Sequence, residues 1–571
     1  MADVPDARGI NVFERDPALQ SLLEVYLPPD LRRHLWPHFQ ALGAEVGGRL
    51  DELAGSADKH PPTLQYRNRQ GFDEQRILKH PDYVQLERTA YSELGLARMS
   101  HAPGALGWPE VMPPMAKYAL TFLFVQAEFG LCCPVSMTDS LTYTMCRHGS
   151  PEVIDRYFSN LTTLDFDALT QGAMFITEQG AGSDVSRITT TATQKDGQWF
   201  LSGDKWFCSN PDAGVAMVLA HVQGAADGLK GLGLFLMPRI LEDGTANRYR
   251  ILRLKDKMGT RSMASGEIAL EGAHAHLIGE VGRGFQLMAD MINWSRLSNG
   301  VRAAGLMRRA VSEALYICRH RQAFNKALID MPLQRKQLLK MMLPSEQARS
   351  MMFQTARVMH LARQGNQAAE KCLRILTPLI KFRACRDARK VAGDGMEIRG
   401  GCGFIEEWSD PRILRDAHLG SIWEGTSNIV ALDVIRAIRR NQGLDHLQCH
   451  LTGLLQEADH LPDASRQALV AKLQAVAAFA TAVSEAEDER DTRKAASALY
   501  HIATAITMAW EASRLQHKGW ARLAWAHLVL RHRLSATDPL ASDYPASHGA
   551  ALGRLLGQEP LTQADALSLL A

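Results

Sequence analysis

Residues 177–184 read Thr-Glu-Gln-Gly-Ala-Gly-Ser-Asp, and residues 423–428 read Trp-Glu-Gly-Thr-Ser-Asn. In both stretches a carboxylate or a hydroxyl stands among small residues, where the backbone can approach a ligand closely. The apolar run 174–176 leads into the first stretch, so a strand is expected to enter a glycine-rich bend there. These two stretches, and the order of elements around them, decide the predicted fold.

Along the chain around these stretches, the periodicity and composition of the sequence change three times. Residues 1–170 are predicted to be mainly helical, 171–285 to form a β domain, 286–440 to form a helical bundle, and 441–571 to add a helical domain rich in Ala and Leu. The predicted class is therefore an α+β protein of several domains. Since the chain has 571 residues, several hydrophobic cores are also expected from its length.

The predicted strands of the β domain are short and rich in Thr and aliphatic residues. They are Thr189–Thr193, Trp199–Leu201, Val215–Ala220, Leu232–Met237 and Glu267–Leu270. Asp196-Gly197 between the first two is a strong hairpin signal. Long helices are expected at Trp294–Arg321 and Leu333–Gln364, and a turn-rich break at Asp538–Pro545.

Composition and charge exclude several classes of protein. The apolar share is 46% and the charged share 22%, as in an ordinary globular protein, and a net charge of +2 gives no field that would recruit nucleic acid or an anionic membrane. The nine cysteines show no metal-type spacing, which favours a reducing compartment with buried thiols. His274-x-His276 is the close histidine pair of the β domain, and because it lacks a third ligand we predict no metal site.

The N-terminus lacks a basic start followed by an apolar run, so no signal peptide is expected. The most apolar stretch, Tyr118–Met137, is interrupted by Gln126 and Glu128, whereas a bilayer span needs about 20 largely uncharged residues. We therefore predict a buried helix there, no membrane span, and a cytoplasmic protein.

The two opening stretches resemble the flavin-binding segment and the catalytic-base segment of the acyl-CoA dehydrogenase family. Other family blocks follow in order: Gly203–Asn210, Lys257–Ser262, Arg319–Asn325 and Glu397–Phe404. The resemblance implies FAD as cofactor and the acyl-CoA dehydrogenase-like fold. That fold has an N-terminal helical domain, a middle β-barrel or sandwich and a C-terminal helical bundle.

The resemblance also implies a set of flavin contacts. Thr177, Gly182 and Ser183 match positions against the isoalloxazine ring, and Phe207 and Ser209 match an aromatic that packs on the ring and a hydroxyl that bonds its edge. Trp206, one place earlier, leaves open which ring shields the flavin. Further contacts are implied at Arg321 and Phe324, whose segment reaches the pyrophosphate of a neighbouring subunit, at Gly400 and Gly401, and at Thr426 and Asn428. The chain departs from the family pattern at Gln179, Asn325 and Glu397, where relatives commonly carry Pro, Gly and Gln.

Glu424 matches the family's catalytic base. The implied reaction is α,β-dehydrogenation of an acyl-CoA thioester, in which Glu424 removes the α-proton and the β-hydride passes to flavin N5. Electrons would then leave to an electron-transferring flavoprotein. Arg296 matches a position near the CoA moiety, with a structural salt bridge as the alternative role.

Finer features resemble the AidB-like branch of the family, the flavoproteins of the bacterial alkylation response. These features are Cys133–Thr138, the Lys205–Phe207 strand, Leu254–Gly259, Ser421–Gly425 and the additional C-terminal helical domain. The branch implies a homotetramer. It also raises a second hypothesis, a DNA-associated protective protein with little dehydrogenase activity.

The charge of the C-terminal domain argues against DNA as a partner. Residues 441–571 hold 11 Lys and Arg against 14 Asp and Glu, a net charge of −3, whereas a DNA-binding domain normally presents a basic face. The local basic cluster consists of Arg514, Lys518, Arg522, Arg531 and Arg533 with His517, His527 and His532. We predict that it solvates a helix, and that the domain packs between subunits.

A third hypothesis, a flavin oxidase that passes electrons to O₂, shares the same fold. Nitroalkane oxidases of this superfamily use Asp at the base position, so Glu424 argues against that subclass. Direct reactivity with oxygen stays open, because it depends on the shape of the cavity around the ring.

Overall fold

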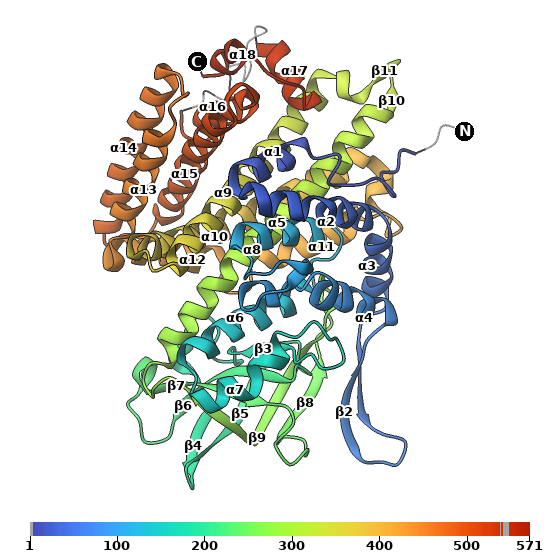
Figure 1. Ribbon diagram of the computed structural model, residues 1–571, viewed down its shortest axis with the longest axis vertical. Helices are drawn as coiled ribbons and strands as arrows, with labels where there is room; N and C mark the ends of the chain where they lie inside the picture. Colours follow the sequence, from blue (N-terminus) through green and yellow to red (C-terminus); the bar gives the residue numbers. More distant parts are fainter. Residues whose placement is uncertain (1–3, 537, 539, 541–547, 571) are drawn as a thin grey trace. The chain divides into compact units, whose positions relative to one another are not determined.

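The computed structural model describes residues 4–536, 538, 540 and 548–570. The chain divides into two compact units, each built from separate segments (Figure 1). The first unit comprises Met1–Gly48, Pro114–Gln126 and Arg296–Ala571, and the second Arg49–Pro113 and Ala127–Ser295. These units cut across the four consecutive domains expected from the sequence, whose boundaries stay a prediction.

The second unit contains a sheet that closes into a barrel. Its strands are β3 (Gly172–Phe175), β4 (Thr191–Lys195), β5 (Gln198–Ser209), β6 (Val215–Val222), β7 (Leu232–Pro238), β8 (Tyr249–Leu254) and β9 (Ser265–Ile278). Pairing runs from β4 through β5, β9, β7 and β6 and returns to β4, while β3 adds in parallel to β6 and β8 adds antiparallel to β9. Closure leaves few open strand edges, which stabilises the sheet against pairing with other chains.

The predicted strands of the β domain are all present, and the predicted hairpin is confirmed. Asp196 (φ 52°) and Gly197 (φ 80°) form a two-residue turn between β4 and β5, in which both residues adopt left-handed backbone. Strands β5 and β9 extend beyond the predicted ranges. The pairing of β5 with β9 shifts register at 201/202 and 205/208, and the second shift passes over Trp206 and Phe207.

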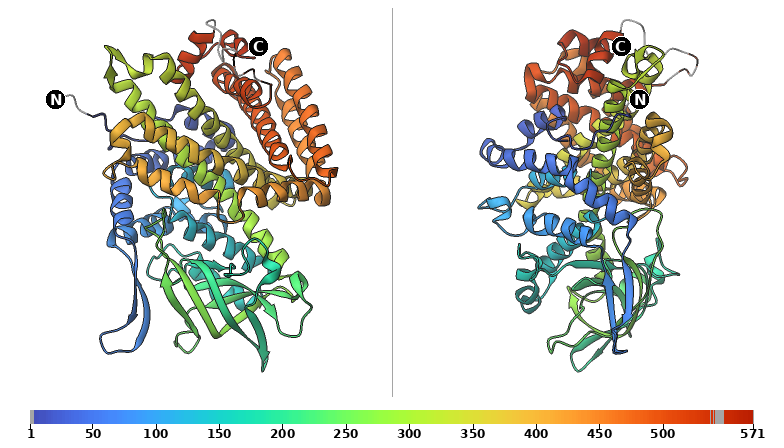
Figure 2. Two further views of the ribbon diagram at one scale, coloured as in Figure 1. Left: turned by 180° about the vertical axis from the view of Figure 1, so that it is seen from behind. Right: turned by 90° about the vertical axis from the view of Figure 1, so that its right-hand side faces the viewer.

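Helices and one further hairpin complete the second unit. The helices are α3 (Arg49–Lys59), α4 (Pro81–Arg88), α6 (Cys132–His148) and α7 (Pro151–Leu161), and the hairpin pairs β1 (Thr63–Arg67) with β2 (Asp73–Leu78). The hairpin extends as a two-stranded arm (Figure 2), and Tyr66 and Gln75 in it form hydrogen bonds with the backbone of β8. The sequence did not predict this arm within the mainly helical residues 1–170, because its residues are mostly polar and exposed.

Helices build the first unit. Its main bundle consists of α1 (Pro17–Tyr26), α2 (Pro29–Gly47), α5 (Pro114–Phe124), α8 (Gly284–His320) from Arg296 onward, α9 (Pro332–Arg363), α10 (Gln367–Arg399), α11 (Asp410–Gly420) and α12 (Ser427–Asn441). A short hairpin, β10 (Gln322–Ala323) and β11 (Lys326–Ala327), follows α8. Helices α8 and α9 confirm the two long helices predicted from the sequence.

The C-terminal helices continue this bundle. They are α13 (Gly443–Glu457), α14 (Asp463–Glu485), α15 (Thr492–Leu515), α16 (Trp520–Arg533), α17 (Gly549–Gly557) and α18 (Gln563–Ser568). Helix α15 packs on α9, α10, α12 and α1, so the C-terminal segment shares a core with the preceding helices (Figure 2). The predicted break at Asp538–Pro545 lies mostly outside the described residues.

Two segments bear on membrane insertion. The apolar stretch 118–137 forms two helices rather than the single predicted one, because α5 ends at Phe124 and α6 begins at Cys132; both are almost wholly buried. Within the part of the chain that the structure describes, α14 alone is long and apolar enough to cross a bilayer. That helix packs against α12, α13 and α15, as a bundle helix does.

Candidate functional site

The segment that carries Glu424 is a strained turn between α11 and α12 in the first unit. Glu424 has φ 52° and Gly425 has φ 99°, so two successive residues adopt left-handed backbone. For a residue other than glycine this conformation costs about 1–3 kcal/mol and persists only where the surroundings hold it. A Cβ atom on Gly425 would lie 3.1 Å from Cγ2 of Val430, which explains the glycine at that position.

Side chains from α8 and α10 hold this turn. Asn299 of α8 donates a hydrogen bond from Nδ2 to Oε2 of Glu424, and Lys381 of α10 donates from Nζ to the carbonyl of Gly425. The guanidinium of Arg302 lies 4.7 Å from the centre of the Trp423 ring. A different side chain therefore fixes each of three groups: the Glu424 carboxylate, the Gly425 carbonyl and the Trp423 ring.

Sequence reasoning missed Asn299 and Lys381. The signal for Asn299 was present: Arg296, Asn299 and Arg302 are polar residues three apart on a helix that is otherwise largely apolar, so they share one face. Lys381 lies between apolar residues of α10 and gave no comparable pattern. Burial lowers the pKa of Lys381 to about 8, although the charge of Glu424 and the thiol of Cys385 act in the opposite direction.

Arg296, predicted to lie near CoA, forms an ion pair. Its Nη1 lies 2.5 Å from Oδ2 of Asp433. Arg374 donates to the same carboxylate, from Nη1 to Oδ2 and from Nη2 to Oδ1. Burial alone would raise the pKa of Asp433, but the hydrogen bonds of Arg374 and the charge of Arg296 hold it well below its usual range. The geometry is that of the structural alternative, and a contact with CoA stays a prediction.

The flavin segment lies in the second unit, directly after β3. The buried carboxylate of Glu178 accepts hydrogen bonds from the backbone of Thr189 (2.7 Å) and Thr190 (3.0 Å) and from Nζ of Lys205 (2.8 Å). The backbone N–H of Trp206 donates to the carbonyl of Thr177 (2.8 Å). Burial would raise the pKa of Glu178, but Lys205 and these donors lower it to about 2, so the segment is fastened to β5 by an ionised carboxylate.

The outer face of this segment offers groups suited to a flat polar ring. Gly182 and Ser183 are exposed, and no atom lies within 4 Å of a Cβ placed on Gly182. The ring of Phe207 is 57% exposed, and Ser209 is half-buried with Oγ 3.4 Å from Oγ of Ser265. Open backbone, hydroxyl groups and an exposed aromatic ring together fit an isoalloxazine.

The ammonium of Lys255 helps to decide which ring, Trp206 or Phe207, is available to shield the flavin. Nζ of Lys255 lies 3.3 Å from the centre of the Trp206 ring and 5.0 Å from that of Phe207. Trp206 is half-buried under this ammonium, whereas Phe207 keeps most of its surface. Phe207 is therefore the better candidate for contact with a cofactor.

The residues predicted for the pyrophosphate meet at the end of α10 in the first unit. Nη1 of the exposed Arg321 donates to the carbonyl of Arg399 (3.0 Å) and would lie 3.5 Å from a Cβ on Gly400. No atom lies within 4 Å of a Cβ on the neighbouring Gly401. A guanidinium beside open glycine backbone fits phosphate oxygens. Phe324 stands at the β10–β11 tip, and Thr426 and Asn428 are exposed at the start of α12.

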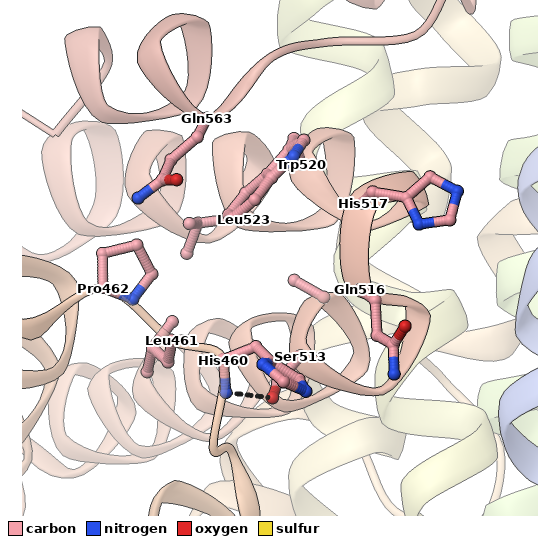
Figure 3. Close-up of a pocket in the computed structure, with 10 residues that line it drawn as sticks. His460, Leu461, Pro462, Ser513, Gln516, His517, Trp520, Leu523 and Gln563 are labelled. Atoms are coloured by element: carbon pink, nitrogen blue, oxygen red, sulfur yellow. Dashed lines mark hydrogen bonds between the residues drawn. The ribbon is translucent and has the colours of Figure 1, made fainter.

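Two cavities lie elsewhere, and none of the predicted site residues lines them. One, of about 390 Å³, is formed by C-terminal residues including His460, Trp520 and Gln563 (Figure 3). The other, of about 510 Å³, lies on the barrel beside Arg156, His274 and His276. Among the described residues, no group of three His, Cys, Asp or Glu side chains is placed to hold a metal ion.

The basic cluster of the C-terminal helices does not form a continuous charged face. Arg522 is buried and paired with Glu346 and Glu511, and the buried His527 contacts Oγ of Ser465 and the carbonyl of Ala566. The exposed Lys518 lies 3.6 Å from Glu24. Part of the cluster therefore serves the core, which weakens the case for a phosphate-binding surface.

Comparison with known proteins agrees with this arrangement. Residues 173–273 match the middle domain of acyl-CoA dehydrogenases, residues 282–439 match their C-terminal domain, and residues 3–168 match the adaptive response protein AidB N-terminal domain. The chain is 33% identical over 417 residues to the putative acyl-CoA dehydrogenase AidB of Escherichia coli (strain K12). That match covers 71% of this chain and 74% of the relative.

Two solved structures extend the likeness over nearly the whole chain. The Caenorhabditis elegans protein ACDH-11, solved in complex with C11-CoA, superposes with a TM-score of 0.83 at 25% identity, over 99% of this chain and 94% of the other. The apo form of Bd2924 gives a TM-score of 0.79 at 28% identity, over 90% and 99% of the two chains. The shared architecture thus includes the C-terminal helices.

Proposed function

Because the chain belongs to the acyl-CoA dehydrogenase family, in its AidB-like branch, we propose that it is an FAD-dependent dehydrogenase of acyl-CoA thioesters with Glu424 as the base. The turn at Glu424 carries this proposal. Its carboxylate is half-buried, bonded to Asn299 and held in a left-handed backbone, which is how a positioned base is expected to look.

Each group has a defined task in the reaction. Glu424 takes the α-proton, and its backbone N–H polarises the thioester carbonyl so that this proton becomes acidic. When bound, FAD supplies the acceptor for the β-hydride at N5. Asn299 orients the carboxylate by a hydrogen bond to Oε2.

The proposed cofactor contacts follow from the exposed groups of each unit. Thr177, Gly182, Ser183, Phe207 and Ser209 would hold the ring, and Arg321 with Gly400 and Gly401 would hold the pyrophosphate. Phe324, Thr426 and Asn428 are proposed to complete the contacts. An electron-transferring flavoprotein is the proposed acceptor of the electrons.

The proposed assembly is a homotetramer. Large apolar side chains of the first unit are strongly exposed in the isolated chain: Phe324 is 92% exposed, Leu333 84% and Phe404 78%. Phe324 and Phe404 belong to the two segments proposed to serve the flavin pyrophosphate of a neighbouring subunit. Apolar side chains this exposed support a contact with another copy.

The test is reduction of bound FAD by acyl-CoA in the absence of oxygen. The panel contains short, branched, medium and long acyl-CoAs, with the eleven-carbon thioester included because ACDH-11 was solved with C11-CoA. We expect one class to bleach the flavin absorbance rapidly. Loss of a catalytic base typically costs about 10²–10⁴-fold in rate, so Glu424→Gln should slow the bleaching by about that factor while FAD stays bound.

The control is Glu485→Gln, at an exposed position at the end of α14, which should reduce at the wild-type rate. Bound FAD that no acyl-CoA reduces in the wild-type protein would contradict the proposed activity. That result would favour the DNA-associated alternative, which is tested by measuring binding to DNA over a range of salt concentrations.

A further inference from the structure

We infer that Lys381 is a positioning residue for the base: by binding the carbonyl of Gly425, it keeps Glu424 in the turn that presents its carboxylate. This inference rests on the proposed function, since it names how that base is held. It concerns a side chain of α10 outside the segments that resemble the flavin and base motifs.

The location of Lys381 makes it an internal anchor. The side chain is 1% exposed, in the middle of α10, and its Nζ donates to the carbonyl of Gly425. A buried ammonium is costly unless it is hydrogen-bonded and lies near a negative charge. The base segment supplies both, a carbonyl at Gly425 and a carboxylate at Glu424.

Lys381 and Asn299 act on successive residues from different helices. Asn299 fixes the end of the Glu424 side chain, whereas Lys381 fixes the backbone one residue further on. Loss of Asn299 would free the carboxylate alone. Loss of Lys381 would release the left-handed backbone that determines where the whole side chain points, because such strain persists only where neighbours hold it.

Charged groups of the base segment and of α8 also surround Lys381. It faces Glu424 in the base segment, Cys385 on its own helix, and Arg296 and Arg302 on α8, and Asp433 of α12 neutralises Arg296. The charge of Glu424 favours the ammonium form of Lys381, which is the form that donates to the carbonyl of Gly425.

The experiment compares Lys381→Met with Lys390→Met in FAD-loaded protein. Lys390 lies on the same helix but its side chain is 72% exposed, so it controls for a lost lysine on α10. We expect Lys381→Met to lower the limiting rate of flavin reduction about 100-fold, the size of effect that a misplaced reacting group produces. The acyl-CoA concentration that gives half of the limiting rate should change by less than about threefold, because the groups that bind acyl-CoA are untouched.

Two further readouts separate positioning from a general loss of structure. Amide hydrogen exchange should accelerate in residues 423–428 of Lys381→Met while helices α9 and α10 keep wild-type protection. Lys381→Arg, which retains a donor and a charge, should recover part of the rate. Lys381→Gln, which retains a donor alone, should recover less.

The outcomes distinguish this inference from the proposed function. If no acyl-CoA reduces the wild-type flavin, the proposed function fails, and hydrogen exchange still tests Lys381. Unchanged exchange in residues 423–428 of Lys381→Met would overturn the inference, as would a wild-type limiting rate. Exchange that accelerates evenly along the chain would also overturn it, because Lys381 would then serve only the stability of α10.

Discussion

Lys205 and Glu178 fasten the flavin segment to the barrel through a buried ion pair. Nζ of Lys205 contacts the carboxylate of Glu178 and the carbonyl of Leu219, each at 2.8 Å. Removal of one partner leaves the other charge buried, which costs about 3–5 kcal/mol. We expect Lys205→Met to lower the free energy of unfolding by about that amount and to weaken binding of FAD, as measured by denaturant titration and flavin fluorescence. Lys195→Met, exposed at the end of β4, is the control and should leave both quantities unchanged.

The same pair predicts a pH dependence. The pKa of Glu178 is about 2 in the folded chain against an ordinary value of 4.5. The unfolded chain therefore takes up the proton first, so this carboxylate stabilises the fold above pH 4.5 and loses that contribution as the pH falls toward 2. Between these limits the stability of wild type should fall more steeply than that of Lys205→Met. Parallel slopes would show that Glu178 is not held in its ionised form by Lys205.

At the residue scale, the sequence could predict which residue is the candidate base but not which side chains hold it in place. Glu424 stands in a short motif with its own signature, and the matching family domain covers it. Asn299 and Lys381 lie inside long helices, where the sequence shows at most that Asn299 shares a polar face with Arg296 and Arg302. Their role depends on which helix face meets the turn, and that is set by tertiary packing.

The β10–β11 hairpin is an element whose shape implies a partner. Phe324 and Asn325 form its tip, and both adopt left-handed backbone (φ 51° and 59°), which Asn tolerates well at the position where relatives carry Gly. The turn leaves the ring of Phe324 92% exposed. Because Phe324 lies in the segment proposed to reach a neighbouring subunit, a ring this exposed supports a contact with another copy of the chain.

We expect Phe324→Ser to weaken the proposed tetramer. A buried aromatic at the centre of an interface contributes about 2 kcal/mol or more, so the dissociation constant should rise by at least about 30-fold. Sedimentation over a range of concentrations measures this. Phe72→Ser is the matched control, because Phe72 is also exposed near the tip of a hairpin, β1–β2, and should leave assembly unchanged. A wild-type protein that stays monomeric would contradict the proposed assembly.

Local signals explain which elements the sequence predicted. The strands of the barrel and helices α8 and α9 have strong periodicity, and the Asp-Gly turn between β4 and β5 needs only two residues to be recognised. The β1–β2 arm buries few side chains, chiefly Ile77, which is too few to create such a pattern. The split of 118–137 into α5 and α6 was hidden because both helices are buried almost all round, which removes the contrast between polar and apolar faces.

At the scale of the first unit, the C-terminal helices are part of the bundle rather than an appendage. A buried polar network joins them to it: Arg522 of α16 pairs with Glu346 of α9 and Glu511 of α15, and Glu511 also accepts a hydrogen bond from Tyr26 of α1 (2.8 Å). The sequence predicted helices here but placed Arg522 in a surface cluster. Composition cannot reveal that a basic residue on a helix has two buried carboxylates as partners on other helices.

From this network we expect the C-terminal segment to stabilise the fold rather than to bind nucleic acid. Arg522→Met removes a buried cation that pairs with both Glu346 and Glu511 and leaves Glu346 its pair with Arg349, so we expect the free energy of unfolding to fall by about 3–5 kcal/mol. Lys518→Met, in the same predicted cluster, removes an exposed pair with Glu24 and should cost less than about 1 kcal/mol. Denaturant unfolding of both variants measures the difference. The opposite outcome is that both variants keep wild-type stability and both lose salt-dependent binding to DNA. The cluster would then be a nucleic-acid surface, and the structural role argued for Arg522 would be wrong.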